Sequence, residues 1–144
     1  MNFIEAKNST RILALDYGEK RVGLAISDIM KIIAKPFKTL SNTSDKSVIN
    51  ELKIIIVEKS IEKIVVGLPM TMSNQESKQT KIVTQFINQL KTAVDIPVIS
   101  YDERLTSIEA KRSLISQGIK TGYNKGAVDM TAAAIFLQNH LDER

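Results

Sequence analysis

The period of the apolar residues changes along this chain, and that change restricts the fold more than any other feature of the sequence. Residues 12–15 and 22–27 are compact apolar runs separated by a turn-rich segment, and bulky residues alternate with small ones in the second run. Alternation with period two is typical of β-strands, so we predict a hairpin. A third extended stretch, residues 32–40, contains Pro36, which indicates the edge of a sheet.

After residue 44, segments with helical period alternate with mainly apolar, β-branched runs. Ser44 or Asp45 is a suitable N-cap for the first of these helices. The predicted helices are residues 45–59, 76–94, 107–117 and 127–141. The apolar runs, typical of buried parallel strands, are residues 61–68 and 96–101. The residues expected on the buried faces of the first two helices are Val48, Ile49, Leu52, Ile55 and Ile56, and Ile82, Val83, Phe86, Ile87 and Leu90.

The predicted order of elements is three strands, a helix, a strand, a helix, a strand and two helices. Three antiparallel strands followed by two parallel strands with crossover helices predict an α/β fold, with one mixed five-stranded sheet and helices on both faces. A length of 144 residues suits one ordinary domain, so we expect residues 1–144 to form a single domain. In such sheets ligands bind at the carboxyl ends of the central strands.

The composition excludes several kinds of site. Cysteine is absent and His140 is the only histidine, which excludes disulfide scaffolds, thiol nucleophiles and zinc sites made of thiolates or several histidines. Carboxylates remain, and they suit a hard cation such as Mg²⁺. The longest aliphatic run, residues 54–57, is far shorter than the roughly 18 residues of a membrane span, so we expect a cytoplasmic protein without membrane contact. The net charge of +4 permits a nucleic-acid partner without requiring one.

Acidic residues occur where two predicted strands end and where the last helix begins. Asp16 ends the first strand, Asp102 and Glu103 follow the fifth, and Asp129 lies in the first predicted turn of the last helix. If the first and fifth strands are neighbours, a helix packed across their ends brings Asp129 to the same place. Three gathered carboxylates repel one another unless a divalent cation neutralises them. We therefore expect one or two Mg²⁺ or Mn²⁺ ions that bind a phosphodiester and activate water.

Each acidic residue also has an ordinary structural explanation. Asp16 is typical of a hairpin turn. Asp129 near a helix N-terminus gains roughly 0.3–1 kcal/mol from the helix dipole. Glu103 beside Arg104 suggests an exposed ion pair of small energetic value, and Asp102 suits a hydrogen-bond acceptor at a strand end. Only the joint placement of these groups favours a metal site.

Basic and aromatic residues near the same edge are candidate contacts for nucleic acid. For each basic residue, a solvated surface position is the alternative. Tyr17 and Tyr101 are candidates for stacking on bases, although tyrosines at strand ends more often pack their rings. The candidate phosphate contacts are Lys20, Arg21, Arg104 and Lys125.

Four segments, in this order, resemble the YqgF family of ribonuclease-H-like proteins, regarded earlier as Holliday junction resolvases and now as pre-16S rRNA nucleases. The segments are LALDYGEKRVGLAISD (13–28), IVVGLP (64–69), DERLTSIEA (102–110) and KGAVDMTAAAIFLQNHL (125–141). The resemblance implies a ribonuclease-H-like fold and metal-dependent cleavage of phosphodiester bonds, with a role in processing the 5′ end of pre-16S rRNA. It also implies that the acidic positions of the family are Asp16, Glu103 and Asp129, and only the resemblance favours Glu103 over Asp102.

The resemblance leaves the substrate and the partners open. The family usually continues after GLP with Asn-Met-Asp-Gly, whereas this chain has residues 71–74 as Thr-Met-Ser-Asn, a departure that concerns substrate contacts. The alternatives to structured RNA are branched DNA, cut by a dimer, and a non-catalytic role on RNA or a ribosomal particle. Both a monomer and a homodimer are compatible with the sequence.

Overall fold

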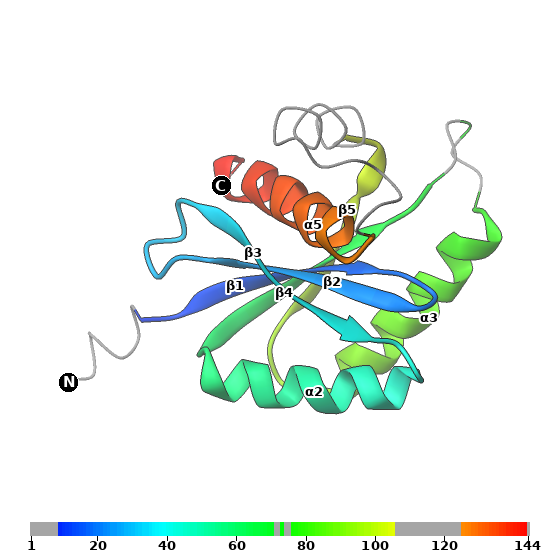
Figure 1. The fold of residues 1–144 in the computed structure, drawn as a ribbon, viewed down its shortest axis with the longest axis horizontal. Coiled ribbons are helices and arrows are strands. Elements are labelled where there is room, and N and C mark those ends of the chain that lie inside the picture. The colour runs from blue at the N-terminus through cyan, green and yellow to red at the C-terminus, as the bar shows by residue number, and fades with distance from the viewer. Residues whose placement is uncertain (1–8, 71–72, 74–75, 106–124, 144) are drawn as a thin grey trace.

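In the computed structural model, the described residues 9–70, 73, 76–105 and 125–143 form five strands and three α-helices (Figure 1). The side chains of residues 105 and 125–128 are outside this description, and so is the helix predicted over 107–117. The elements are β1 (Arg11–Tyr17), β2 (Arg21–Ser27), β3 (Ala34–Ser41), α2 (Asp45–Glu58), β4 (Ile61–Leu68), α3 (Lys78–Ala93), β5 (Val98–Asp102), the 3-10 turn η1 (Glu103–Leu105) and α5 (Lys125–Asp142).

The strands form one mixed sheet in the order β3-β2-β1-β4-β5. β2 is antiparallel to β1 and β3, whereas β4 is parallel to β1 and β5. The predicted mixed sheet and the edge position of the strand that contains Pro36 are confirmed. The assumption that the first and fifth strands are neighbours is wrong, because β2 occupies one side of β1 and β4 occupies the other.

Helices cover both faces of the sheet: α2 and α3 lie on one face and α5 lies on the other (Figure 1). Because side chains alternate along a strand, each face has its own core. On the α2/α3 side the core includes Leu13, Leu15, Leu24, Val66, Phe86 and Leu90. On the α5 side it includes Ile12, Ala14, Ala25, Val65, Phe136 and Leu137.

The alternation of bulky and small residues in β2 explains how closely α5 approaches the sheet. Val22 and Leu24 face α2 and α3, whereas Ala25 packs in the core beneath α5. A Cβ atom built on Gly23 would lie 2.5 Å from the backbone carbon of Asp129, which is closer than atoms in contact can be. The small face of β2 therefore lets the helix backbone rest directly on the sheet.

The helix starts confirm one predicted cap and correct one boundary. Ser44 caps α2, and its Oγ accepts a hydrogen bond from Ser47 N at 3.0 Å. Ser77 caps α3 in a reciprocal capping box with Thr80, so this helix begins at residue 78 rather than at the predicted residue 76. The prediction that Ile82 is buried is wrong: this residue is 38% exposed, whereas Thr80 is buried and donates a hydrogen bond to the carbonyl oxygen of Pro69.

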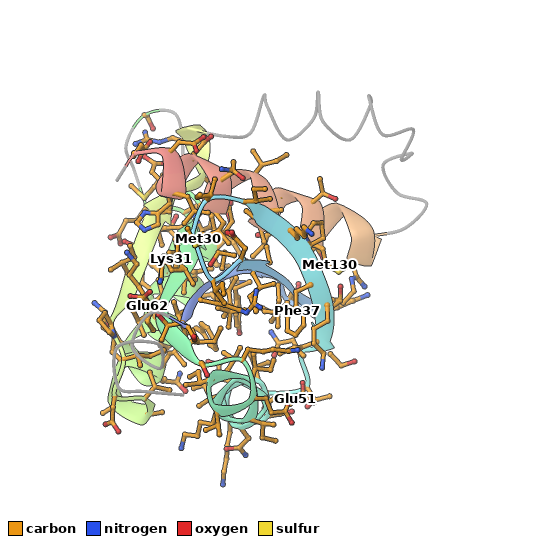
Figure 2. All side chains as sticks on the ribbon, turned by 90° about the vertical axis from the view of Figure 1, so that its left-hand side faces the viewer. Met30, Lys31, Phe37, Glu51, Glu62 and Met130 are labelled. Atoms are coloured by element: carbon orange, nitrogen blue, oxygen red, sulfur yellow. The ribbon has the colours of Figure 1, made fainter. Side chains whose placement is uncertain are left out.

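The β2–β3 hairpin replaces the first residues of the predicted third strand with a turn. The backbone N–H groups of Ile32 and Ile33 donate to Asp28 Oδ1 at 2.8 and 3.0 Å, so β3 begins only at Ala34. Lys31 anchors this turn to the start of β4 by an ion pair with Glu62 at 2.9 Å, and Figure 2 labels both residues. No helix in the described residues is long and apolar enough to cross a membrane.

Candidate active site

Asp16 lies near the carboxyl end of β1, opposite Gly23 of β2. The alternation along β1 gives it the same face as Ile12 and Ala14, which belong to the core beneath α5. The hairpin turn itself closes further on, where Gly18 N donates to the carbonyl oxygen of Arg21 at 2.8 Å. Asp16 is therefore a strand residue on the α5 face of the sheet. The explanation of Asp16 as a residue of the hairpin turn is wrong.

Glu103 follows β5 in the turn η1, and its carboxylate extends across β4 toward Asp16. A Cβ atom on Gly67 of β4 would lie 2.5 Å from Glu103 Oε1, so the absence of a side chain at Gly67 makes room for the Glu103 carboxylate. A hydrogen bond joins the carboxyl groups of Glu103 and Asp16. Although β1 and β5 are not neighbours, the acidic side chains at their ends meet across the strand between them.

Asp129 completes the group from α5. Its backbone packs on Gly23, the partner of Asp16 across the hairpin, so Asp129 lies on the same side of the sheet as Asp16. The helix begins at Lys125, two residues before the predicted start at residue 127, and Asp129 therefore lies beyond its first turn. Because the dipole effect falls off within that turn, it does not account for Asp129.

The three acidic side chains influence one another electrostatically. Burial raises the pKa of Asp16 well above its usual value of 3.8, and the charges of Glu103 and Asp129 raise it further. Burial also raises the pKa of Glu103. The hydrogen bond with Asp16 lowers this pKa in part, and the negative charges of Asp102 and Asp129 raise it further. Ionising all three groups together is therefore unfavourable unless a positive charge joins them.

Arg21 forms an ion pair with one member of this acidic group, Asp129. Its Nε lies 3.7 Å from Asp129 Oδ2, and this buried nitrogen has no hydrogen-bond partner in the described residues. In this arrangement, no three acidic or histidine side chains in the described part of the chain have the spacing of a shared metal ion.

The structure distinguishes Asp102 from Glu103. Both oxygens of Asp102 accept hydrogen bonds from Arg104, at 2.6 Å from Nη2 and 3.0 Å from Nε. These bonds lower the pKa of Asp102 and hold it as an ionised acceptor. Arg104 therefore pairs with Asp102, whereas the carboxyl group of Glu103 contacts Asp16.

The other predicted contacts have different surroundings. Lys20 is exposed in the hairpin turn, and Lys125 begins α5 with a side chain outside the described atoms. The ring of Tyr17 packs against Phe86 with 4.5 Å between centroids, and the ring of Tyr101 stacks on Phe136 at 5.9 Å. Both tyrosines are buried, so neither offers an open ring face for a base.

Sequence reasoning missed the two glycines that shape the site. Gly23 admits the helix that carries Asp129, and Gly67 admits the Glu103 carboxylate. Their signal was a glycine inside a strand, which often marks a close approach of another group. The pairing of Arg21 with Asp129 was also missed, because the two residues are distant in sequence.

The sequence model of the RuvX family, described as "Holliday junction resolvase", matches residues 10–143. The chain belongs to this family. RuvX relatives with the name "Putative pre-16S rRNA nuclease" include a protein of Endomicrobium trichonymphae, 42% identical over 135 residues, which cover 92% of this chain and 95% of that relative. A second, from Chloroflexus aurantiacus (strain ATCC 29366 / DSM 635 / J-10-fl), is 39% identical over 137 residues, covering 95% of this chain and 90% of the relative.

Solved structures show that this RuvX chain has the RuvC fold, which is ribonuclease-H-like. T. thermophilus RuvC in complex with a Holliday junction substrate superposes with a TM-score of 0.61 at 12% identity, covering 94% of this chain and 95% of the other. Fowlpox virus resolvase in complex with Holliday junction DNA gives a TM-score of 0.57 at 12% identity, covering 93% and 98%. At this identity the likeness concerns the fold alone. The predicted fold and family are confirmed.

Proposed function

We propose that this RuvX-family protein is a divalent-metal-dependent endonuclease that processes the 5′ end of pre-16S rRNA. The observation that carries the proposal is the convergence of Asp16, Glu103 and Asp129 on one face at the carboxyl edge of the sheet. The names of the RuvX relatives support RNA as the substrate. Such a substrate implies action in the cytoplasm, on free precursor RNA or on a ribosomal particle.

The donor set fits a hard divalent cation. All three side chains offer carboxylate oxygens, the ligands that Mg²⁺ and Mn²⁺ prefer, and their mutual repulsion favours a cation between them. Asp16, Glu103 and Asp129 would hold one or two such ions, with Asp129 turning from Arg21 to join the other two. When bound, the ion would supply the charge that activates the attacking water and stabilises the leaving oxygen.

The protein groups contribute charge, orientation and proton transfer. Asp16 and Glu103 share a hydrogen-bonded proton, which must leave before both act as ligands, so metal binding is expected to release protons. Gly67 and Gly23 fix the approach of Glu103 and Asp129 by leaving no room for a side chain. Arg21 is placed to orient Asp129, and it can contact a substrate phosphate when Asp129 turns away.

Cleavage of a precursor rRNA fragment tests the proposal. With Mg²⁺ or Mn²⁺ the protein should cleave near the 5′ end of the 16S sequence, and Asp16→Asn should lower the rate by about 100-fold or more because the ligand charge is lost. Asp95→Asn, an exposed carboxylate after α3, is the matched control and should cleave like wild type. Equal rates for wild type and Asp16→Asn, or activity that survives a chelator, would contradict the proposal.

A four-way DNA junction is the second substrate to test, because the RuvC fold and the description of the RuvX family both point to it. The same preparation should be given both substrates at equal concentration, with native mass spectrometry to separate monomer from homodimer. Cleavage of the junction alone, by a dimer, would favour a resolvase. Binding of precursor RNA without cleavage of either substrate would favour a non-catalytic factor.

A further inference from the structure

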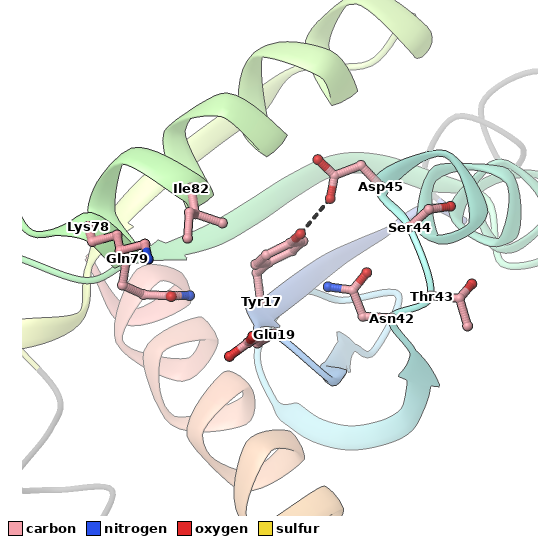
Figure 3. Close-up of a pocket in the computed structure, with 9 residues that line it drawn as sticks. All are labelled: Tyr17, Glu19, Asn42, Thr43, Ser44, Asp45, Lys78, Gln79 and Ile82. Atoms are coloured by element: carbon pink, nitrogen blue, oxygen red, sulfur yellow. Dashed lines mark hydrogen bonds between the residues drawn. The ribbon is translucent and has the colours of Figure 1, made fainter.

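A second candidate site lies at the same edge of the sheet, on the face opposite the acidic group. It is a cavity of about 490 Å³ between the start of α2, the start of α3 and the end of β1. In Figure 3, Tyr17 lies between α3 on one side and the β3–α2 connection on the other. The residues lining it are Tyr17, Glu19, Asn42, Thr43, Ser44, Asp45, Lys78, Gln79 and Ile82. We refer to it as the Tyr17 pocket.

The Tyr17 pocket and the acidic group are connected by two consecutive residues of β1, Asp16 and Tyr17. Asp16 points to the α5 face, whereas Tyr17 belongs to the core of the α2/α3 face. Both lie where β1 ends, at the edge where ligands of such sheets bind. A strand of nucleic acid that crosses this edge can therefore place one nucleotide in the pocket while a neighbouring phosphate lies at the acidic group.

The floor of the Tyr17 pocket is fixed by contacts within the protein. Tyr17 donates a hydrogen bond from its hydroxyl to Asp45 Oδ1, and Gln89 Nε2 donates to Asp45 Oδ2 at 3.0 Å. Asn42 Nδ2 donates to the carbonyl oxygen of Gly18 at 2.8 Å, which leaves its amide oxygen as an acceptor. These bonds hold the polar groups in place before a ligand arrives, which lowers the entropic cost of binding.

The wall formed by α3 presents an amide, an ammonium group and an aliphatic side chain to the pocket. The side chains of Gln79 and Lys78 make no hydrogen bond or ion pair with other described residues, and Ile82 next to them is 38% exposed. An amide reads the edge of a base, an ammonium pairs with a phosphate, and an aliphatic side chain covers a ring. The carboxylates of Glu19 and Asp45 disfavour a bare anion, but they accept hydrogen bonds from exocyclic amino groups of bases.

We propose that the Tyr17 pocket binds one unpaired nucleotide, with its base between Ile82 and the polar groups of Gln79 and Asn42, and with its phosphate at Lys78. The cavity volume lies within the roughly 300–1,000 Å³ of small-ligand sites. Proteins read RNA sequence mainly at unpaired bases, so this site would select where the substrate is cut. The proposal rests on the nuclease function, because it names a substrate subsite of that enzyme.

Binding of a short single-stranded RNA, measured by fluorescence anisotropy with the full chain in EDTA, tests the subsite without the metal. Gln79→Ala and Lys78→Ala should each weaken binding by about tenfold, and Lys78→Ala should reduce the salt-dependence slope by about 0.7, the share of one phosphate on a single strand. Gln85→Ala and Lys81→Ala, exposed residues of the same helix outside the pocket, are the matched controls and should bind like wild type.

Free nucleoside monophosphates, added to ¹⁵N-labelled protein and followed by NMR, distinguish a strand from a free nucleotide as the source of the ligand. Shifts at Gln79 and Asn42 with RNA alone support a strand subsite, and shifts with both ligands support a pocket that also accepts the free nucleotide. Unchanged RNA affinity in both α3 variants would overturn the proposal even if cleavage proceeds. Pocket-dependent binding without cleavage in Mg²⁺ would overturn the nuclease function instead.

Discussion

At the scale of single residues, the main feature of the candidate site is that ionising its carboxyl groups together is unfavourable. Asp16 is half-buried, and its pKa is raised first by that burial and then by the charges of Glu103 and Asp129. A carboxyl whose pKa is raised in the folded state binds its proton more tightly there than in the unfolded chain, where the pKa of Asp is about 3.9. The folded state therefore gains stability from this group at low pH and loses it as the pH rises through the raised pKa.

The raised pKa of Asp16 predicts that wild type and Asp16→Asn differ in how their thermal stability depends on pH. Without divalent ions, wild type should lose thermal stability relative to the variant as the pH increases from 4 to 8, because only wild type must ionise Asp16. Thermal unfolding in EDTA at several pH values measures the difference, which should amount to a few degrees. Mg²⁺ should then raise the melting temperature of wild type more at pH 8 than at pH 5. Parallel stability curves for the two proteins would contradict the prediction.

At the scale of the elements, two glycines in the strands on either side of β1 fix how α5 and η1 approach the sheet. At Gly23 an added Cβ meets the backbone of Asp129 at 2.5 Å, and backbone cannot move without moving α5. At Gly67 it meets Glu103 Oε1 at 2.5 Å, the end of a flexible side chain, and a ring carbon of Phe136 at 2.9 Å. The same substitution therefore has different consequences at the two positions.

Alanine at each glycine separates stability from activity. Gly23→Ala should lower the free energy of unfolding by about 1–3 kcal/mol, the usual cost of overpacking, because α5 must shift. Gly67→Ala should cost less stability, yet it should reduce cleavage by about tenfold or more by displacing Glu103. Urea unfolding and cleavage rates of both variants measure the two effects. A larger loss of stability in Gly67→Ala than in Gly23→Ala would contradict this prediction, because it would show that the contact between Gly23 and α5 yields more easily than the contacts at Gly67.

The elements were predictable from the sequence wherever one local pattern decides the structure. The strand over residues 61–68 has the predicted bounds, since a mainly apolar, β-branched run that ends at Pro69 leaves few alternatives. The burial of Ile82 was predicted wrongly because the helical period does not show how much of the helix surface packs against the sheet. Thr80, which takes part in the capping box, is buried instead. The order of strands was only partly predictable, because the side of β1 that receives β4 depends on packing between distant segments.

The residues of the candidate site follow from the sequence, whereas their relative positions follow from it only in part. The acidic residues at the ends of β1 and β5 follow from the strand pattern, but the choice of Glu103 needed the structure or the family, because η1 rotates Asp102 and Glu103 to different partners. The Tyr17 pocket was not foreseen. Its signal is the alternation in β1, which directs Tyr17 to the face opposite Asp16, but the cavity depends on where two helices begin.

At the scale of the whole molecule, the sheet separates two cores that serve different sites. The core beneath α2 and α3 supports the Tyr17 pocket, and the smaller core beneath α5 holds the helix that carries Asp129. Leu90 and Leu137 are fully buried, one in each core. Similar cavities made in the two cores should therefore lower the free energy of unfolding by similar amounts. They should differ in their effect on the affinity for metal ions.

The pair Leu90→Ala and Leu137→Ala tests this separation. Each should lower the free energy of unfolding by about 2–5 kcal/mol, because each leaves a cavity in a buried layer. At a temperature where both variants remain folded, Leu137→Ala should weaken Mg²⁺ binding, measured by titration calorimetry, while Leu90→Ala should leave it near the wild-type value. Equal weakening in both would indicate that the two layers are mechanically coupled through the sheet.

The position of Asp129 in α5 also has a consequence for biosynthesis. Asp16 is made early and Glu103 later, but the third carboxylate emerges with the final helix, which rests on a strand formed at the beginning. Domains fold as units while the amino-terminal part appears first. A nascent chain in which α5 has not yet packed on β2 therefore lacks the third carboxylate of the proposed centre, and under the proposed function cleavage must await the folding of this helix.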